Sequence, residues 1–166
     1  MIKQLISIVL VVVSFSVFAQ KHDGECISGD CENGYGVYKT VYGHVYKGMF
    51  KNGEYNDTNA FLDMGDGYWY KGGFVNSERS GYGINQFGPL SAGFVRIEGI
   101  WKNGRLNGHG KITYTTGLTS EGDYIDTTPN GKFILKYQDD NGVNHMKYVW
   151  YSKEKPYISL KEQQVY

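Results

Sequence analysis

The stretch "ENGYGVYKTVYGHVYKGMFKNG", from Glu32 to Gly53, places glycine and aromatic residues at fixed offsets. Its motif "YKGMF" returns as "YKGGF" at Tyr70–Phe74 and, further along the chain, as "IEGIW" and "SEGDY". The four copies are 24, 27 and 23 residues apart, counted between their central glycines, Gly48, Gly72, Gly99 and Gly122. Self-similarity at a nearly constant period is typical of a repeat architecture.

Each copy contains the elements of a β-hairpin. The runs "GVYKTVY" and "GKITYTT" are rich in β-branched and aromatic residues, and they end at Gly43 and Gly117, where the chain must turn. The signals "KNG", "VNS" and "KNG" after the first three copies predict turns between successive hairpins. Because side chains alternate along a strand, Tyr46, Gly48 and Phe50 share one face. The glycine leaves a slot between two aromatic residues, and a ring from a neighbouring strand can cover it.

The pattern resembles the MORN (membrane occupation and recognition nexus) repeat, whose units are hairpins of about this length. The consensus Gly-x-Gly-x-Tyr, Gly, Tyr-x-Gly-x-Phe and Asn-Gly matches the first copy from Gly34 to Gly53. The opening "GDCENGYGVY" is similar to the start of exported bacterial MORN proteins. The resemblance covers residues 30–137 and implies an all-β fold, an elongated single-layer antiparallel sheet of tandem β-hairpins. The structural repeat glycines are then Gly34, Gly36, Gly48, Gly72, Gly81, Gly83, Gly99, Gly108, Gly110 and Gly122.

Some copies depart from this pattern. The second has "NDTNA" in place of its Gly-x-Gly, and the third has about four extra residues, which predict a longer loop at Gly88–Gly93. Ile97 and Ser120 replace the first aromatic residue of the third and fourth copies. A fifth copy, "NGKFILKYQDDNGVNHMKYVWY", is degenerate, as terminal units of stacked folds often are. The tail "KEKPYISLKEQQVY" is expected to form either a last strand or a short helix that covers the open edge.

The first residues, "MIKQLISIVLVVVSFSVFAQ", have the layout of a secretory signal peptide. Lys3 is their only charge, and "VFA" forms a small-residue cleavage site before Gln20. The apolar run at 5–13 is shorter than the roughly 20 residues that span a bilayer, which favours cleavage after Ala19 over an uncleaved anchor. The expected organisation is a signal peptide at 1–19, an N-terminal cap with a cysteine pair at 20–33, the repeat domain at 34–137, and a degenerate repeat with a C-terminal cap at 138–166.

Cys26 and Cys31 flank "ISGD", which contains turn residues, in the part expected to be exported. An oxidising compartment favours a disulfide between them over free thiols. A metal site that used His22 would need more ligands, because zinc normally takes four. The disulfide closes a short loop, so its contribution is at most roughly 2 kcal/mol.

Residues 20–166 contain 16 basic and 17 acidic residues, a net charge of −1 with histidine neutral. The two signs are interleaved, so no basic stripe indicates nucleic acid or an anionic membrane as the partner. His44 and His109 have no nucleophile or second metal ligand at a recognisable spacing, and we interpret both as structural. The "GYG" at Gly34 lacks the lysine and helix of a phosphate loop. We therefore predict no enzyme activity, cofactor or metal.

Aromatic residues carry the remaining functional signal, because 15 tyrosines and 3 tryptophans are more than a core of this size requires. They fill the glycine slots, or they also present an aromatic face to a protein or a sugar. We expect a non-catalytic scaffold or protein-binding surface in the cell envelope or outside the cell, with another envelope protein as partner; the alternative is recognition of cell-wall glycan or lipid headgroups. The candidate binding residues are Tyr38, Tyr46, Phe50, Tyr70, Phe74, Trp101 and Tyr124.

Overall fold

The computed structural model describes residues 23–151 and the backbone of residues 158–164. The signal peptide expected at 1–19 and His22 lie outside the described residues. The thirteen strands are β1 (Gly24–Gly29), β2 (Tyr35–Thr40), β3 (Val45–Lys51), β4 (Glu54–Tyr55), β5 (Asp57–Gly65), β6 (Tyr68–Val75), β7 (Glu78–Gln86), β8 (Phe94–Lys102), β9 (Arg105–Tyr114), β10 (Thr119–Ile125), β11 (Thr128–Gln138), β12 (Asn144–Tyr151) and β13 (Ile158–Gln164). The part of the chain that the structure describes contains no helix that could cross a membrane.

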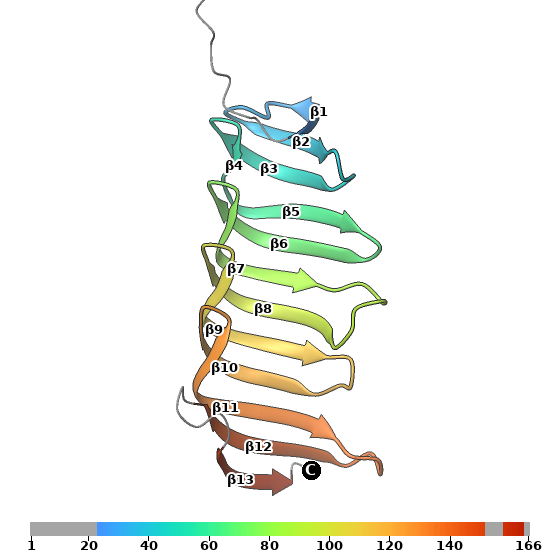
Figure 1. Cartoon of the computed structure of the whole chain (residues 1–166), viewed down its shortest axis with the longest axis vertical. Coiled ribbons are helices and arrows are strands. Elements are labelled where there is room, and N and C mark those ends of the chain that lie inside the picture. Colours follow the sequence, from blue (N-terminus) through green and yellow to red (C-terminus); the bar gives the residue numbers. More distant parts are fainter. Residues whose placement is uncertain (1–22, 152–157, 165–166) are drawn as a thin grey trace, which may run out of the picture.

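The strands form one open antiparallel sheet whose order follows the chain from β1 to β13 (Figure 1). The short β4 is the exception, because it pairs only with the end of β3. This confirms the predicted all-β, single-layer sheet of tandem hairpins. The sheet continues through residues 33 and 137, where the sequence suggested boundaries. Of the two forms expected for the tail, residues 158–164 adopt the strand, and it pairs with β12.

Turns of two residues connect each hairpin to the next, and in Figure 1 they form a column along one side of the sheet. Both residues of each turn have positive φ, for example 53° and 78° at Asn52–Gly53. This backbone matches the right-handed twist of the flanking strands and favours asparagine and glycine. The predicted turns at Asn76–Ser77 and Asn103–Gly104 are confirmed. A fourth turn, at Asp126–Thr127, contains neither asparagine nor glycine, and no turn signal in the sequence predicted it.

A β-bulge follows each of the last three of these turns. Between the Gly72–Gly83 pair and the Phe74–Arg79 pair, one residue of β6 lies opposite three of β7. The pairs formed by β8 and β9 shift in the same way between Gly99 and Trp101. Such bulges bend the longer strand. The bend brings the residues just after each turn over one face of the sheet, which we call the inner face.

One row across the inner face consists almost entirely of glycine. Cross-strand pairing joins Gly36 to Gly48 and continues through the later repeats to Gly122, which lies opposite Phe133. In β5 this row is occupied by Ala60, which pairs with Gly72. A Cβ added to Gly48 would lie 2.8 Å from the Cβ of Ala60. The "NDTNA" departure therefore keeps a small side chain in the row. Its members are Gly36, Gly48, Ala60, Gly72, Gly83, Gly99, Gly110 and Gly122.

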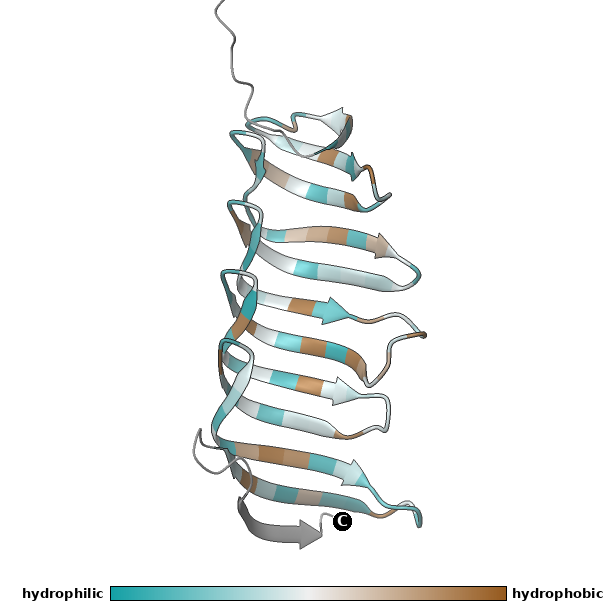
Figure 2. Cartoon of the chain, in the orientation of Figure 1, coloured by the Kyte–Doolittle hydropathy of each residue, from teal (hydrophilic) through white to brown (hydrophobic). Residues whose placement is uncertain are grey.

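The inner face carries the core, and hydrophobic and hydrophilic residues alternate along the strands (Figure 2). In β3, for example, Tyr46 and Phe50 are buried, whereas Lys47 between them is exposed. At the N-terminal end, Cys26 and Cys31 form the predicted disulfide. If Gly36 carried a Cβ, that atom would lie only 2.7 Å from the Sγ of Cys31. The disulfide thus closes the first glycine slot.

Candidate binding surface

The structure places all seven aromatic binding candidates in the core. None is more than 7% exposed, because the inner face is covered by the segments that follow the inter-repeat turns. The expectation that these rings present a binding face is therefore corrected: they fill the repeat, which was the other interpretation of their number. The seven are Tyr38, Tyr46, Phe50, Tyr70, Phe74, Trp101 and Tyr124.

Tyrosine rings cover the glycine row in the first two repeats. The hydroxyl of Tyr46 lies 2.5 Å from an added Cβ on Gly48, and that of Tyr70 lies 2.6 Å from one on Gly72, each in its own strand. The Tyr46 hydroxyl donates to the carbonyl of Met49 at 2.9 Å. The ring thus lies along the sheet rather than projecting from it. Glycine is required in these positions because a larger residue would displace a buried ring.

Different residues cover the row in the third and fourth repeats. Leu106 contacts Gly99 and Gly110, and it replaces the ring that the sequence pattern predicts above Gly99. The ring of Phe133 covers Gly122. These two side chains occupy the space left by Ile97 and Ser120, which stand where the earlier repeats have tyrosine. The departures from the consensus are therefore compensated by residues of the following strand.

Burial also changes the acid–base properties of the core. It raises the pKa of Tyr55, Tyr70 and Tyr124 to about 12. Arg79 follows the second inter-repeat turn, and its guanidinium lies 4.7 Å from the ring centroid of Tyr70 and 5.2 Å from that of Trp101. Burial lowers the pKa of Arg79, while the two rings favour its cation. This half-buried arginine therefore packs against the aromatic core.

The opposite, outer face exposes a short set of apolar side chains. Tyr35 pairs with Met49, and Tyr82 pairs with Ile100; the exposed fractions are 58%, 42%, 59% and 41%. Both tyrosines are the middle residue of a "GYG" motif, and both partners follow the central glycine of a repeat. We call these four residues the outer strip. The repeat sequence places them in equivalent positions of the first and third repeats.

A hollow of about 500 Å³ separates the two halves of the outer strip. Met49 and Tyr82 line it, together with Asp57, Gly73 and Ser80. It exists because the second repeat has Gly73 where its neighbours have Met49 and Ile100. The degenerate second repeat thus leaves a hollow in the outer face. No part of the sequence pattern singled out Met49, Tyr82 or Ile100, because exposed and buried aromatic residues look alike in one sequence.

The next hairpin has polar groups in the position of the outer strip. His109 contacts Asp123 at 3.1 Å and Glu121 at 3.4 Å. The hydrogen bond to Asp123 is the main reason why the pKa of His109 is raised. A second histidine, His145, contacts Asp139 at 2.9 Å. Among the described residues, no three histidine, cysteine or acidic side chains come together as a metal site.

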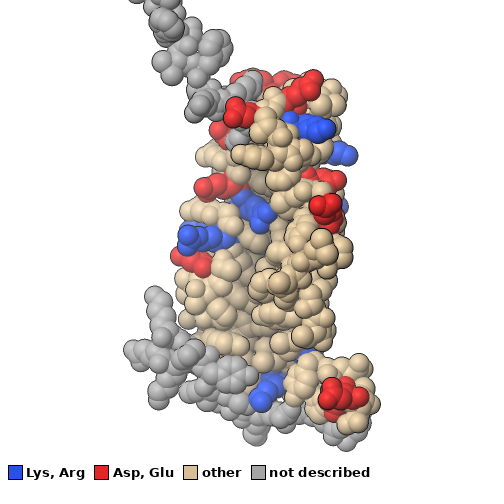
Figure 3. All heavy atoms as spheres, turned by 45° about the vertical axis from the view of Figure 1, so that its right-hand side comes forward, with Lys and Arg blue, Asp and Glu red and all other residues tan. Residues whose placement is uncertain are grey.

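Charges of both signs are interspersed on the face that Figure 3 shows. Arg96, for instance, pairs with Glu98 at 3.0 Å on the outer face. Such a surface does not attract a polyanion, because binding to nucleic acid or anionic lipid depends on clustered basic residues. The exposed apolar side chains of the outer strip are the most distinctive contact groups of the outer face.

Comparison with known proteins agrees with the hairpin architecture. The model of the MORN repeat matches residues 70–86 and 98–119, which lie in β6–β7 and β8–β10. Alsin from Mus musculus is 28% identical over 121 residues, which cover 69% of this chain and 6% of Alsin. The chain thus aligns with only a small part of that protein. The predicted MORN resemblance is confirmed in the matched stretches, and MORN repeats are, in general, non-enzymatic modules that bind proteins or membranes.

Proposed function

We propose that this chain is an exported, non-catalytic scaffold that binds another protein in the cell envelope or outside the cell. The outer strip carries this proposal. Tyrosine, methionine and other apolar residues are enriched in protein contacts, where a polar rim surrounds an apolar centre. Here two exposed tyrosine-containing pairs lie on either side of a hollow of about 500 Å³.

A rigid sheet suits such a role. The strands are linked in chain order, and the rings over the glycine row are fully buried in the first two repeats. The outer strip is therefore held in position before a partner arrives, which lowers the entropic cost of binding. A protruding apolar side chain of the partner would enter the hollow, and the four strip residues would surround it.

Two observations support export. The first residues have the pattern of a secretory signal peptide. Cys26 and Cys31 form a disulfide, and disulfides persist mainly in oxidising compartments. The exported bacterial type of MORN protein, which the opening "GDCENGYGVY" resembles, has the same expected location. Basic and acidic residues are interleaved along the chain, which favours a protein over an anionic lipid as the partner.

The binding proposal is tested with the immobilised chain and an envelope extract. The strip variant Tyr82→Ser with Ile100→Ser is compared with a control, Leu90→Ser with Ile125→Ser, which removes exposed apolar groups outside the strip. We expect a protein that the wild type and the control retain and that the strip variant loses. Equal retention by all three, or retention of glycan or lipid without protein, contradicts the proposal.

Export is tested separately by expressing the full chain in a bacterium and measuring intact masses in each cell fraction. We expect a chain that begins near Gln20 and is found outside the cytoplasm. Recovery of the uncleaved chain in the cytoplasm, with both cysteines reduced, would contradict this part of the proposal and leave the binding result unaffected.

A further inference from the structure

A cleft lies between the fourth and fifth hairpins. Strands β10 and β11 pair from Thr119 and Lys136 inward, and beyond this pair the turns at 115–118 and 139–143 separate. The cleft between them has a volume of about 690 Å³. This volume is within the range of roughly 300–1,000 Å³ that is typical of small-molecule sites.

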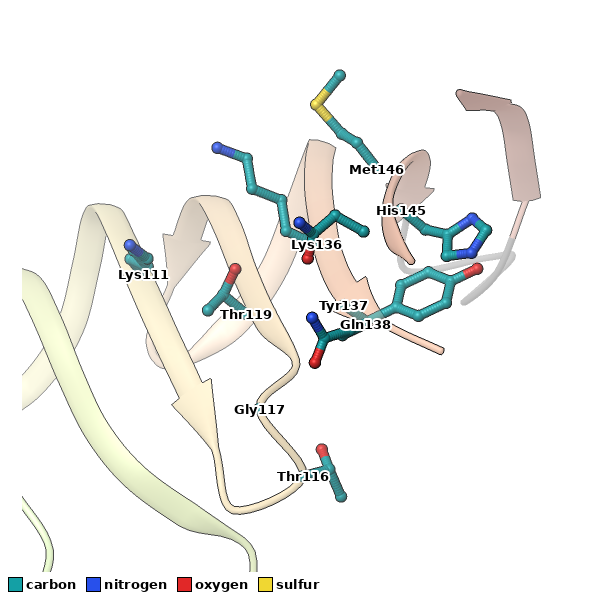
Figure 4. A pocket seen from close by; sticks show the side chains of 10 residues that line it. Lys111, Thr116, Gly117, Thr119, Lys136, Tyr137, Gln138, His145 and Met146 are labelled. Carbon is teal, nitrogen blue, oxygen red and sulfur yellow. The ribbon is translucent and has the colours of Figure 1, made fainter. Parts of the chain in front are cut away.

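The cleft is lined by two cations and by no carboxylate. Lys111 and Lys136 contribute the charges, and Thr119 lies between them in the view of Figure 4. Among the side chains that the structure describes, neither lysine forms an ion pair. Two acidic residues pair with Lys111 in register, but Glu98 binds Arg96 at 3.0 Å and Glu121 contacts His109. The lysines are therefore available to an anionic ligand.

The remaining lining is suited to hydroxyl groups. Thr116, Thr119, Gln138 and Asn144 present hydroxyls and amides, which both donate and accept hydrogen bonds. The Nε2 of Gln138 donates to the carbonyl of Gly142 at 3.0 Å, which positions its amide at the rim. Such groups distinguish a polyol from a simple inorganic anion.

An aromatic pair borders the cleft from the other face of the sheet. Tyr137 pairs with His145, whereas Lys136 pairs with Met146, and successive side chains of a strand point to opposite faces. The rings of Tyr137 and His145 are stacked, with centroids 5.1 Å apart and an interplanar angle of 14°. Asp139 holds His145 through its Nε2 at 2.9 Å, so the pair is fixed in position. The pair therefore braces the end of the fifth hairpin behind the cleft, and the lysines and polar groups of the outer face are the contacts left to a ligand.

We propose that this cleft binds an anionic saccharide of the uronic acid class, at a site distinct from the outer strip. Its carboxylate binds Lys111 and Lys136, and its hydroxyls bind Thr119, Gln138 and Asn144. A nucleotide or phosphate site would be expected to use arginine forks or a glycine-rich turn at a helix, and the described residues around the cleft contain neither. A lipid surface would need about four to eight clustered cations rather than two.

The test uses trigalacturonate as the probe and calorimetric titration of the purified chain as the measurement. We expect the wild type to bind trigalacturonate and to bind the neutral maltotriose weakly or not at all. Lys111→Gln and Lys136→Gln should each reduce the affinity roughly three- to tenfold, because each removes a charge-assisted hydrogen bond. Added salt should weaken the binding further, because the cleft is open to solvent.

Lys47→Gln and Lys71→Gln are the matched controls, because cross-strand pairing places these lysines in the same row as Lys111. They should leave the affinity unchanged. An equal loss in these controls, or no binding of trigalacturonate by the wild type, overturns the site. Equal affinity for maltotriose overturns the role of the charge, and equal affinity for inorganic phosphate overturns the assignment to a saccharide. None of these outcomes bears on the outer strip.

Discussion

The substitution Gly122→Ala is expected to destabilise the protein, although alanine has a better intrinsic preference for strands than glycine. The φ of Gly122 does not lie in the left-handed region, so alanine can adopt the backbone there. Fewer unfolded conformations would by themselves stabilise the variant by about 0.4–1 kcal/mol. Any loss of stability must therefore come from contacts in the folded state.

The methyl group of alanine at position 122 would clash with a buried ring. An added Cβ would lie 2.7–2.8 Å from three atoms of the Phe133 ring. The ring cannot move away easily, because it is fully buried between Tyr124 at 5.1 Å and Tyr151 at 5.0 Å. Overpacking of this kind typically costs about 1–3 kcal/mol. After the gain from the unfolded state is subtracted, we expect a net loss of about 1–2 kcal/mol.

Chemical denaturation of four proteins tests this: the wild type, Gly122→Ala, Phe133→Val and the double variant. Phe133→Val should cost stability through the cavity it leaves. In that background, Gly122→Ala should become neutral or stabilising, since its methyl group enters the cavity. The two substitutions should therefore be strongly non-additive. A single Gly122→Ala that stabilises the protein, or a cost that persists without the ring, would refute the role of the glycine row.

Three further predictions concern titration and the disulfide. Because burial raises the pKa of Tyr70 from 10.0 to about 12, the folded chain keeps the phenolic proton longer, and urea midpoints should fall as the pH rises from 10 to 12. Because the pKa of His109 is raised in the folded chain, its small contribution to stability is complete below pH 6.5 and is lost as the pH rises through the folded-state pKa. An NMR titration should give His109 a lower pKa in the variant Asp123→Asn than in the wild type. Replacing Cys26 and Cys31 with serine should cost about 2 kcal/mol in denaturation, and failure to fold would contradict this.

Sequence reasoning was most successful where neighbouring residues decide the structure. The positive φ values at Asn52–Gly53 and Asn103–Gly104 follow from residues that tolerate them, and these turns set the hairpins. Alternation in "YKGMF" then assigns Tyr46 and Phe50 to one face. These local rules were sufficient to predict an all-β sheet of tandem hairpins and the extended loop of the third repeat, whereas the disulfide was predicted from the expected export of the chain.

The candidate site was harder to predict. A period of two separates the faces of a strand but does not say which face another segment covers. Trp101 and Tyr82 are both aromatic residues of a repeat motif, yet the first is buried and the second is 59% exposed. The difference arises because the residues after each inter-repeat turn fold over the inner face only. The predicted binding residues were therefore core residues, and the exposed ones were missed.

The amino-acid sequence by itself determined the repeat, the first three of its turns and the alternation of faces, because each depends on residues close together in the chain. Only the tertiary structure decided which side chain covers each glycine. Leu106 covers Gly99, and Phe133 covers Gly122, since bulges in β9 and β11 bring residues from after the turn back over the sheet. The cleft beside Lys136 likewise exists only because two hairpins diverge beyond their last pair, and no local pattern encodes where neighbouring hairpins separate.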